Sequence, residues 1–250
     1  MSPRLEFALK AARAAGDSTL EVFQKRGGFE FKSDETPVTA ADRRAEEIIR
    51  SHIESEFSGE TVLGEEQGLT GHSPDRWVID PIDGTKSFIA GVPLYATLLS
   101  WEEDGDPKLG IAYFPALDLM LWAEKGQGAF ANGAPTRIKN ETDPKRSIIC
   151  HGSLRTLGLK GRLEGFFDLA GRSLAAKGWG DAYGYALVAT GRAQAMVDPI
   201  VSHWDISSVS LIVREAGARF TTLDGREALE NQGLAAVPGM QAALLEALRA

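Results

Sequence analysis

Cysteine is nearly absent from this chain, and so are the basic clusters and long apolar runs that mark several classes of protein. Cys150 is the only cysteine among 250 residues, so no disulfide can form within the chain, which favours a reducing compartment. The amino-terminal stretch carries charges at Arg4, Glu6 and Lys10 that interrupt the apolar region of a signal peptide, and no run is long enough to cross a bilayer. We therefore expect a cytoplasmic protein with no membrane partner.

Positive charge is scarce relative to negative charge. The 27 lysine and arginine residues face 35 aspartate and glutamate residues, which leaves a formal net charge of -8. Binding to nucleic-acid phosphates requires clustered Lys and Arg, so we expect no nucleic-acid partner. An acidic protein can instead collect divalent cations before it meets an anionic substrate. With 43% hydrophobic residues, the chain is long enough to bury a core as one α/β or α+β unit.

The first half of the chain combines two helical segments with several strands. Ser2 and Pro3 start an apolar stripe that predicts a helix ending near Gly27 and Gly28. Thr39 and Asp42 have the spacing of a capping box at the start of a second helix. Short strands, followed by an antiparallel meander, are expected at residues 61–64, 76–80, 95–101, 109–114 and 119–124.

The pattern restarts beyond Asn140. Strands are expected at residues 147–150, 195–197, 219–222 and 234–237, and helices at residues 159–169, 183–190, 206–216 and 240–250. Asp205 is expected to cap the strongly apolar helix at 206–216.

The hexapeptide Asp80-Pro81-Ile82-Asp83-Gly84-Thr85 carries the strongest chemical signal in the chain. Two carboxylates flank a rigid proline, and the Gly-Thr pair opens what looks like a helix. Carboxylates and a free backbone carbonyl are hard oxygen ligands that suit Mg²⁺, and the backbone N–H groups of Gly84 and Thr85 could receive a phosphate. The same hexapeptide would also serve as an Asx-type turn between a strand and a helix.

Three further acidic positions add weight to the metal interpretation. They are Asp42 in the first turn of a helix, Glu65 directly after a strand, and Asp205 at another helix start. Taken singly, each has a simpler explanation as a capping residue or a solvated turn. Their joint occurrence with the hexapeptide favours a shared cation site over four unrelated turns and caps.

The order and spacing of these motifs resemble the inositol monophosphatase superfamily, whose patterns are GEE after a strand, DPIDGT followed by a small residue and Phe, and WD opening an apolar helix. The segments that carry the resemblance are Lys32-Ser33-Asp34, Thr39 to Asp42, Gly64-Glu65-Glu66, Asp80 to Phe88, Gly126 to Phe130, Trp204-Asp205 and Glu215 to Gly217. The implied fold is an α/β (α+β) layered αβαβα sandwich. It would form one compact unit, with a sheet-rich amino-terminal half at residues 1–140 that carries most metal ligands and a smaller α/β carboxyl-terminal half at residues 141–250 that completes the site.

The resemblance also implies the metal ligands. Glu65, Asp80 and the carbonyl of Ile82 would hold one Mg²⁺. Asp80, Asp83 and Asp205 would hold a second, so that Asp80 bridges the two ions. A third, weaker ion would lie beside Glu65, which gives two or three Mg²⁺ per subunit.

The expected catalytic residues are Glu65, Asp42 and Thr85, of which the last two would orient the attacking water. In two-metal phosphoryl transfer, metal-bound water becomes a nucleophile near neutral pH, and metal charge stabilises the equatorial and leaving oxygens. No covalent enzyme intermediate is required. The resemblance therefore implies a Mg²⁺-dependent phosphatase that acts on a small phosphate ester, and members of this family are commonly homodimers.

Within the superfamily, the segments Gly180 to Ala193 and Met196 to Pro199 look most like the histidinol-phosphate phosphatases. Histidinol phosphate carries an ammonium and an imidazole that acidic residues such as Asp181 and Asp198 could meet. Lys86, within the similar segment after the hexapeptide, is the third expected substrate contact. We expect hydrolysis of L-histidinol phosphate to L-histidinol and phosphate, which would place the enzyme in histidine biosynthesis.

Ser207 and Ser208 depart from the family pattern, in which two alanines more often follow the WD segment. Their hydroxyls could lie near the leaving group and alter the choice of substrate. Inositol 1-phosphate, fructose 1,6-bisphosphate and a nucleotide 3′-phosphate remain open as substrates. A catalytically silent regulatory scaffold is the alternative from another class, and loss of a metal ligand would favour it, but every expected ligand is present.

The segment from Cys150 to Arg155 superficially resembles the thiolate loop of cysteine phosphatases. Only four residues separate its cysteine from its arginine, where that loop uses five. We therefore expect Cys150 to be a small buried residue rather than a nucleophile.

Overall fold

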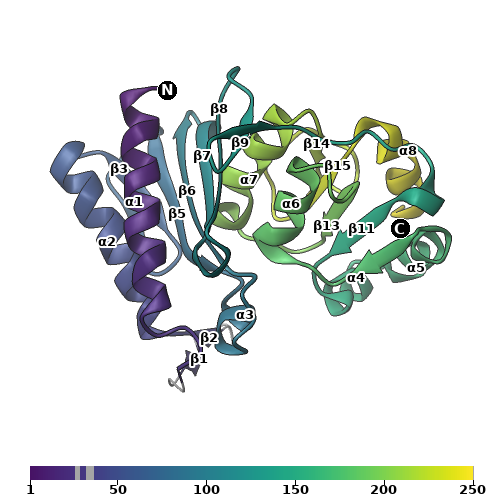
Figure 1. Cartoon of the computed structure of the whole chain (residues 1–250), viewed down its shortest axis with the longest axis horizontal. Helices are drawn as coiled ribbons and strands as arrows, with labels where there is room; N and C mark the ends of the chain where they lie inside the picture. The colour runs from purple at the N-terminus through teal and green to yellow at the C-terminus, as the bar shows by residue number, and fades with distance from the viewer. Residues whose placement is uncertain (26–28, 32–36, 250) are drawn as a thin grey trace.

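Five alternating layers of helices and sheets are visible in the computed structural model, which describes residues 1–25, 29–31 and 37–249 (Figure 1). This order confirms the αβαβα sandwich. Three groups of residues named in the predictions lie outside the described ranges: Gly27 and Gly28, the Lys32-Ser33-Asp34 segment, and Ala250. In the part of the chain that the structure describes, no helix is long and apolar enough to cross a membrane.

The first layer consists of α1 (Pro3–Leu20) and α2 (Ala40–Glu56). Ser2 caps α1 by accepting a hydrogen bond from Leu5 N, as the sequence predicts, but the helix ends at Leu20, short of the expected glycines. Small residues let α1 approach the sheet closely, because a Cβ added at Gly16 would lie 2.5 Å from a ring carbon of Tyr113.

The first sheet is eight-stranded, in the order β10-β9-β8-β7-β6-β5-β3-β4. Its strands are β3 (Thr61–Gly64), β4 (Gly68–Thr70), β5 (Arg76–Asp83), β6 (Ala96–Glu103), β7 (Asp106–Phe114), β8 (Leu119–Glu124), β9 (Ala129–Ala131) and β10 (Ala134–Thr136). The antiparallel pairing of β6, β7 and β8 confirms the predicted meander. β5 pairs in parallel with β3, so the carboxyl ends of these two strands meet at one edge.

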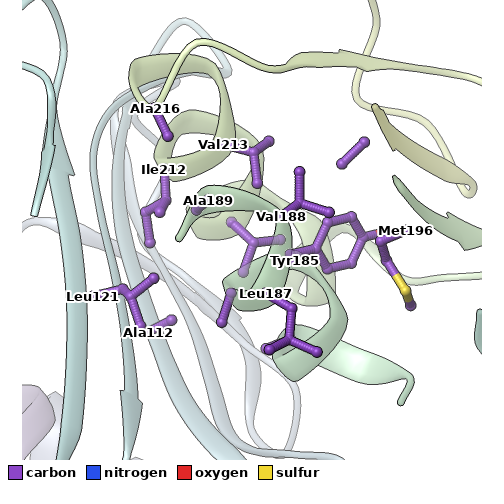
Figure 2. Packing of buried hydrophobic residues seen from close by; sticks show 14 of the residues in the cluster. Ala112, Leu121, Tyr185, Leu187, Val188, Ala189, Met196, Ile212, Val213 and Ala216 are labelled. Carbon is purple, nitrogen blue, oxygen red and sulfur yellow. The ribbon is translucent and has the colours of Figure 1, made fainter. Parts of the chain in front are cut away.

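The middle layer holds α6 (Asp181–Ala189) and α7 (His203–Glu215), which lie between the two sheets (Figure 1). Figure 2 shows Tyr185 and Val188 of α6 between Leu121 of the first sheet and Met196 of the second. Because both sides of this layer are covered, α6 and α7 are buried around most of their circumference.

The second sheet is five-stranded, in the order β12-β11-β13-β15-β14, and helices cover its outer face (Figure 1). Its strands are β11 (Ile148–His151), β12 (Ala175–Lys177), β13 (Ala195–Asp198), β14 (Arg219–Thr221) and β15 (Gly233–Ala236), and the outer helices are α4 (Leu154–Leu159), α5 (Leu163–Arg172) and α8 (Pro238–Ala247). The helix predicted near 159–169 matches α5 over most of its length, but its predicted start reaches back to the end of α4. The chain breaks at Gly161, which has a left-handed φ of 67°, and forms α4 and α5 instead.

The remaining short elements connect these layers. They are the hairpin of β1 (Glu30–Phe31) and β2 (Pro37–Val38), the helix α3 (Thr85–Ile89), and the 3-10 turns Pro115–Leu117 and Pro144–Arg146. Of these, α3 follows the carboxyl end of β5 directly, as the hexapeptide predicts.

Candidate active site

Three carboxylates meet where β5 ends against α7. One oxygen from each of Asp80, Asp83 and Asp205 lies within 4.8 Å of the other two. Side chains three residues apart on a regular strand point to opposite faces. The pairing of β5 with β6 shifts register between Asp80 and Asp83, and this irregularity allows both side chains to reach the same place.

Asp205 reaches the cluster from the first turn of α7. The helix begins at His203 with Ser202 as its N-cap, so the prediction that Asp205 itself caps a helix starting at Ile206 was wrong. The Asp205 Oδ2 atom accepts a hydrogen bond of 2.8 Å from Ser202 N. This contact fixes the carboxylate at the helix start, where the positive end of the helix dipole favours negative charge.

Glu65 lies at the same sheet edge, directly after β3, and Glu65 N donates to the Ile79 carbonyl at 3.2 Å. Glu46 of α2, which is fully buried, holds the following turn by accepting from Glu66 N at 2.7 Å and Gln67 N at 3.1 Å. A Cβ at Gly64 would lie 2.2 Å from Glu46 Oε1, so the absence of a side chain at Gly64 leaves room for the Glu46 carboxylate.

Glu46 was not singled out by the sequence analysis. Its position four residues after Asp42 could have indicated that it lies on the same buried face of α2, since residues i and i+4 share one face of a helix.

Asp42 occupies the third position of α2, where its Oδ2 atom accepts from Thr39 N at 2.8 Å and from Thr39 Oγ1 at 2.6 Å. The predicted capping box is therefore confirmed. The Oδ1 atom of Asp42 is buried and has no hydrogen-bond partner among the described residues. Burial raises the pKa of Asp42, and the Glu65 carboxylate adds to the increase against the hydrogen bonds from Thr39.

A pocket of about 150 Å³ opens at the acidic cluster. Its lining residues are Glu65, Asp80, Ile82, Asp83, Gly84, Thr85, Lys86, Asp181 and Asp205. Most of the predicted site residues are thus brought together in one place. Asp42 and Asp198 are not among the described lining residues. Lining carboxylates nevertheless raise their pKa: Glu65 that of Asp42, and Asp181 and Asp205 that of Asp198.

The segment after Asp83 is shaped by Gly84, whose φ of 79° is left-handed. A Cβ at this position would lie 3.1 Å from Asp181 Oδ2, which places the Asp181 carboxylate directly against the turn. Thr85 Oγ1 donates to the Ile82 carbonyl at 3.1 Å. A carbonyl oxygen has two lone pairs, so Ile82 retains the capacity to bind a cation.

Asp181 and Asp198 form a second acidic pair beside the cluster. Ala182 N, in the first turn of α6, donates to Asp83 Oδ2 at 2.7 Å, which brings the start of α6 onto the metal-ligand candidates. Asp198, at the end of β13, is buried. Burial raises its pKa well above the ordinary value, and the charges of Asp181 and Asp205 raise it further.

Electrostatics make the cluster a fitting place for a divalent cation. Burial raises the pKa of Asp80 and Asp83 well above the ordinary value, and the neighbouring carboxylates add to the increase. Burial likewise raises the pKa of Asp205 to about 7, although the hydrogen bond from Ser202 opposes the shift. The buried Oδ1 atom of Asp80 has no hydrogen-bond partner in the described parts of the chain. An orphaned carboxylate oxygen within a set of hard oxygen donors fits Mg²⁺ or a similar ion.

The two serines that depart from the family pattern lie elsewhere. Ser207 and Ser208 are buried, and neither is a described lining residue of the pocket, so the expectation that their hydroxyls lie near the leaving group was wrong. Ser207 Oγ instead contacts Glu102 and Ser100. Cys150 is buried as predicted, and burial raises the pKa of its thiol to about 12, which is unsuited to a thiolate nucleophile.

Comparison with known proteins agrees with this geometry. The sequence profile of the Inositol monophosphatase family matches residues 1–250. A histidinol-phosphatase from Chlorobaculum parvum is 41% identical over 94% of this chain and 92% of its own, and one from Streptomyces coelicolor is 37% identical over the same shares. The structure of extragenic suppressor protein suhB from Bartonella henselae superposes with a TM-score of 0.94 at 27% identity, covering 99% of both chains. The chain belongs to the inositol monophosphatase family of metal-dependent phosphomonoesterases.

Proposed function

We propose that this enzyme hydrolyses L-histidinol phosphate to L-histidinol and phosphate, with Mg²⁺ as its cofactor. The observation that carries the proposal is the second acidic pair, Asp181 and Asp198, next to the three-carboxylate cluster. The similarity of this chain to two histidinol-phosphatases along almost its whole length supports the same substrate.

The cation would be held by the carboxylates of Glu65, Asp80, Asp83 and Asp205 and by the carbonyl of Ile82. Bound Mg²⁺ would supply an activated water and positive charge for the phosphoryl oxygens. Asp80 would be the central ligand, because the charges of Glu65, Asp83 and Asp205 all raise the pKa of its carboxyl.

Thr85 and Asp42 would orient the attacking water. Thr85 lines the pocket, and Asp42 offers a buried oxygen that has no hydrogen-bond partner among the described residues. Asp42 is close enough to Glu65 for their charges to interact. The backbone N–H groups of Gly84 and Thr85 would receive the phosphate.

Recognition of the alcohol portion would depend on charge. Asp198 is buried and Asp181 is half-buried beside the acidic cluster, so their negative charges repel one another. A substrate that brings an ammonium or imidazolium group would relieve that repulsion. Lys86 is exposed and its charge acts on Asp181, so its place is the pocket rim. A neutral inositol ring would leave the carboxylates uncompensated.

The test compares phosphate release from L-histidinol phosphate and from inositol 1-phosphate at equal concentration, with and without Mg²⁺, using Asp80→Asn as the blank. We expect a Mg²⁺-dependent preference for L-histidinol phosphate. Asp198→Asn should lower kcat/KM for L-histidinol phosphate by roughly 10- to 100-fold, because a negative charge that attracts the cationic group is lost, and should change turnover of inositol 1-phosphate much less. The matched control is Asp168→Asn, which changes an exposed carboxylate on α5. Equal losses on both substrates would contradict recognition of a cationic group by Asp198.

We also propose that the enzyme is a homodimer. Large apolar side chains are exposed on the outer helices and beside the edge strand β12, among them Leu159 at 64%, Phe167 at 53% and Leu174 at 63% exposure. A second copy of the chain could cover such exposed apolar groups. Light scattering should give twice the chain mass of 26.9 kDa, and Phe167→Glu should shift the mass towards one chain.

A further inference from the structure

A fully buried carboxylate outside the acidic cluster joins the first sheet to α7. Glu102, near the end of β6, has no exposed surface. Its Oε1 atom accepts from His203 Nε2 at 2.6 Å and from Ser207 Oγ at 2.7 Å, and its Oε2 atom accepts from Arg76 Nε at 2.9 Å. A buried carboxylate is tolerated when such partners compensate it.

Ser207 extends this network further into the interface between the sheet and α7. Its hydroxyl lies 2.6 Å from Ser100 Oγ, and because Ser207 donates to Glu102, Ser100 donates to Ser207. Both serines are buried. The network therefore bonds β5, β6 and α7 to one another through side chains, in addition to the apolar packing between these elements.

The same three elements place the candidate metal ligands. Asp80 and Asp83 lie on β5 opposite Leu98 and Ala96 of β6, while Asp205 lies on α7, two residues before Ser207. Mutual repulsion of the carboxylates acts to push α7 away from β5. The hydrogen bonds of Glu102 oppose that movement, because they attach the first turns of α7 to the sheet.

We propose that Glu102 and Ser207 are positioning residues, which keep Asp205 within ligand distance of Asp80 and Asp83 by bonding α7 to β6. The inference rests on the metal site proposed above. It assigns a role to a buried serine and to a buried strand carboxylate, neither of which is among the described lining residues of the pocket.

Ser208 provides a matched control on the same helix. It is also buried, but its hydroxyl has no hydrogen-bond partner within the described ranges, so Ser208→Ala removes an oxygen without breaking a bond to the sheet. Ser207→Ala removes the same atom together with two hydrogen bonds. Glu102→Gln keeps the side-chain volume and removes the charge that His203 and Arg76 share.

The experiment measures Mn²⁺ binding by isothermal titration calorimetry on the full chain without substrate, with Asp80→Asn as the reference that lacks binding. We expect the dissociation constant of Ser207→Ala to rise about ten-fold, as for other outer partners of metal ligands, with a larger rise for Glu102→Gln and no change for Ser208→Ala. At saturating Mg²⁺, the KM for the phosphate ester should stay close to that of the wild type in Ser207→Ala.

A purely structural contribution would give a different result. Thermal unfolding of each variant is compared with Ile149→Val, a conservative change in the core of the second sheet that lowers stability away from the site. If Ser207→Ala lowers stability but binds Mn²⁺ like Ile149→Val, or if Ser208→Ala weakens binding equally, the positioning role is refuted. Failure of the wild type to bind Mn²⁺ would refute the metal site and this inference together, whereas a different substrate preference would leave the result intact.

Discussion

Replacing Asp80 by asparagine should make the metal-free protein more stable while it removes the response to metal. Oxygens of Asp80, Asp83 and Asp205 lie within 4.8 Å of one another. At an effective dielectric constant of about 20, two unit charges at that separation repel by roughly 3.5 kcal/mol. Proton uptake relieves part of this repulsion, because the pKa of these carboxyls is raised. We therefore expect Asp80→Asn to gain about 2 kcal/mol in free energy of unfolding at pH 8 in EDTA.

The assay is thermal unfolding with EDTA and with excess Mg²⁺. A gain of about 2 kcal/mol corresponds to a rise in Tm of roughly 4–8 °C for a chain of this size. In Mg²⁺ at about 100 times its dissociation constant, the wild type should gain about 2.7 kcal/mol from binding, and Asp80→Asn should gain almost nothing. The Tm of Asp80→Asn should therefore exceed that of the wild type in EDTA, and in Mg²⁺ this difference should vanish or change sign.

Asp168→Asn controls for the loss of one charge from an acidic protein and should follow the wild type in both conditions. A lower Tm of Asp80→Asn in EDTA would show that carboxylate repulsion does not dominate this cluster. Retention of the wild-type response to Mg²⁺ would show that Asp80 is not a ligand.

Two further predictions concern pH and backbone space. The pKa of Asp80, Asp83 and Asp205 is raised in the folded, metal-free protein, so these groups hold protons that the unfolded chain releases above about pH 4. Their contribution to stability is fully present below that pH and is lost as pH rises, for Asp205 through about 7. Calorimetry in EDTA should show Tm falling from pH 5 to pH 8, and saturating Mg²⁺ should flatten the slope. Gly64→Ala should cost about 1–3 kcal/mol in chemical denaturation and reduce activity, because the new Cβ would press on Glu46 and displace the Glu65 turn. Gly171→Ala on α5 is the control, since the described chain places nothing within 4 Å of its Cβ, and it should be neutral or stabilising; equal losses from both changes would contradict the crowding at Gly64.

Much of the fold could be predicted because its signals are local. The largely apolar segments of β6, β7 and β8 and the Asp104-Gly105 turn define the meander without reference to other parts of the chain. The break at Gly161 was harder to predict, because the apolar spacing continues across it and only the backbone conformation separates α4 from α5. At α7, the Ser202 to Asp205 spacing was a readable capping box, and recognising it would have given the correct helix start.

The acidic cluster was predictable for a related reason, since strand ends and helix starts collect ligands in α/β folds. The burial of Glu102 was not predictable, because this residue lies beside Glu103 and a polar turn and therefore has the sequence context of a solvated residue. Its burial depends on Arg76, His203 and Ser207, which lie between 26 and 105 positions away along the chain. The orientation of Ser207 was equally hidden, because both sides of α7 are covered and polarity does not mark one exposed face.

Because Cys150 is buried, its reactivity reports on conformational opening of the enzyme. The thiol sits on β11 within the core that α6 and α7 share, and the chain contains no second cysteine to confuse the signal. A thiol reagent can modify it only during excursions that separate the middle layer from the second sheet. The labelling rate therefore reports how often that part of the molecule opens, and slower labelling in Mg²⁺ would reveal how far the influence of the bound ion spreads beyond the pocket.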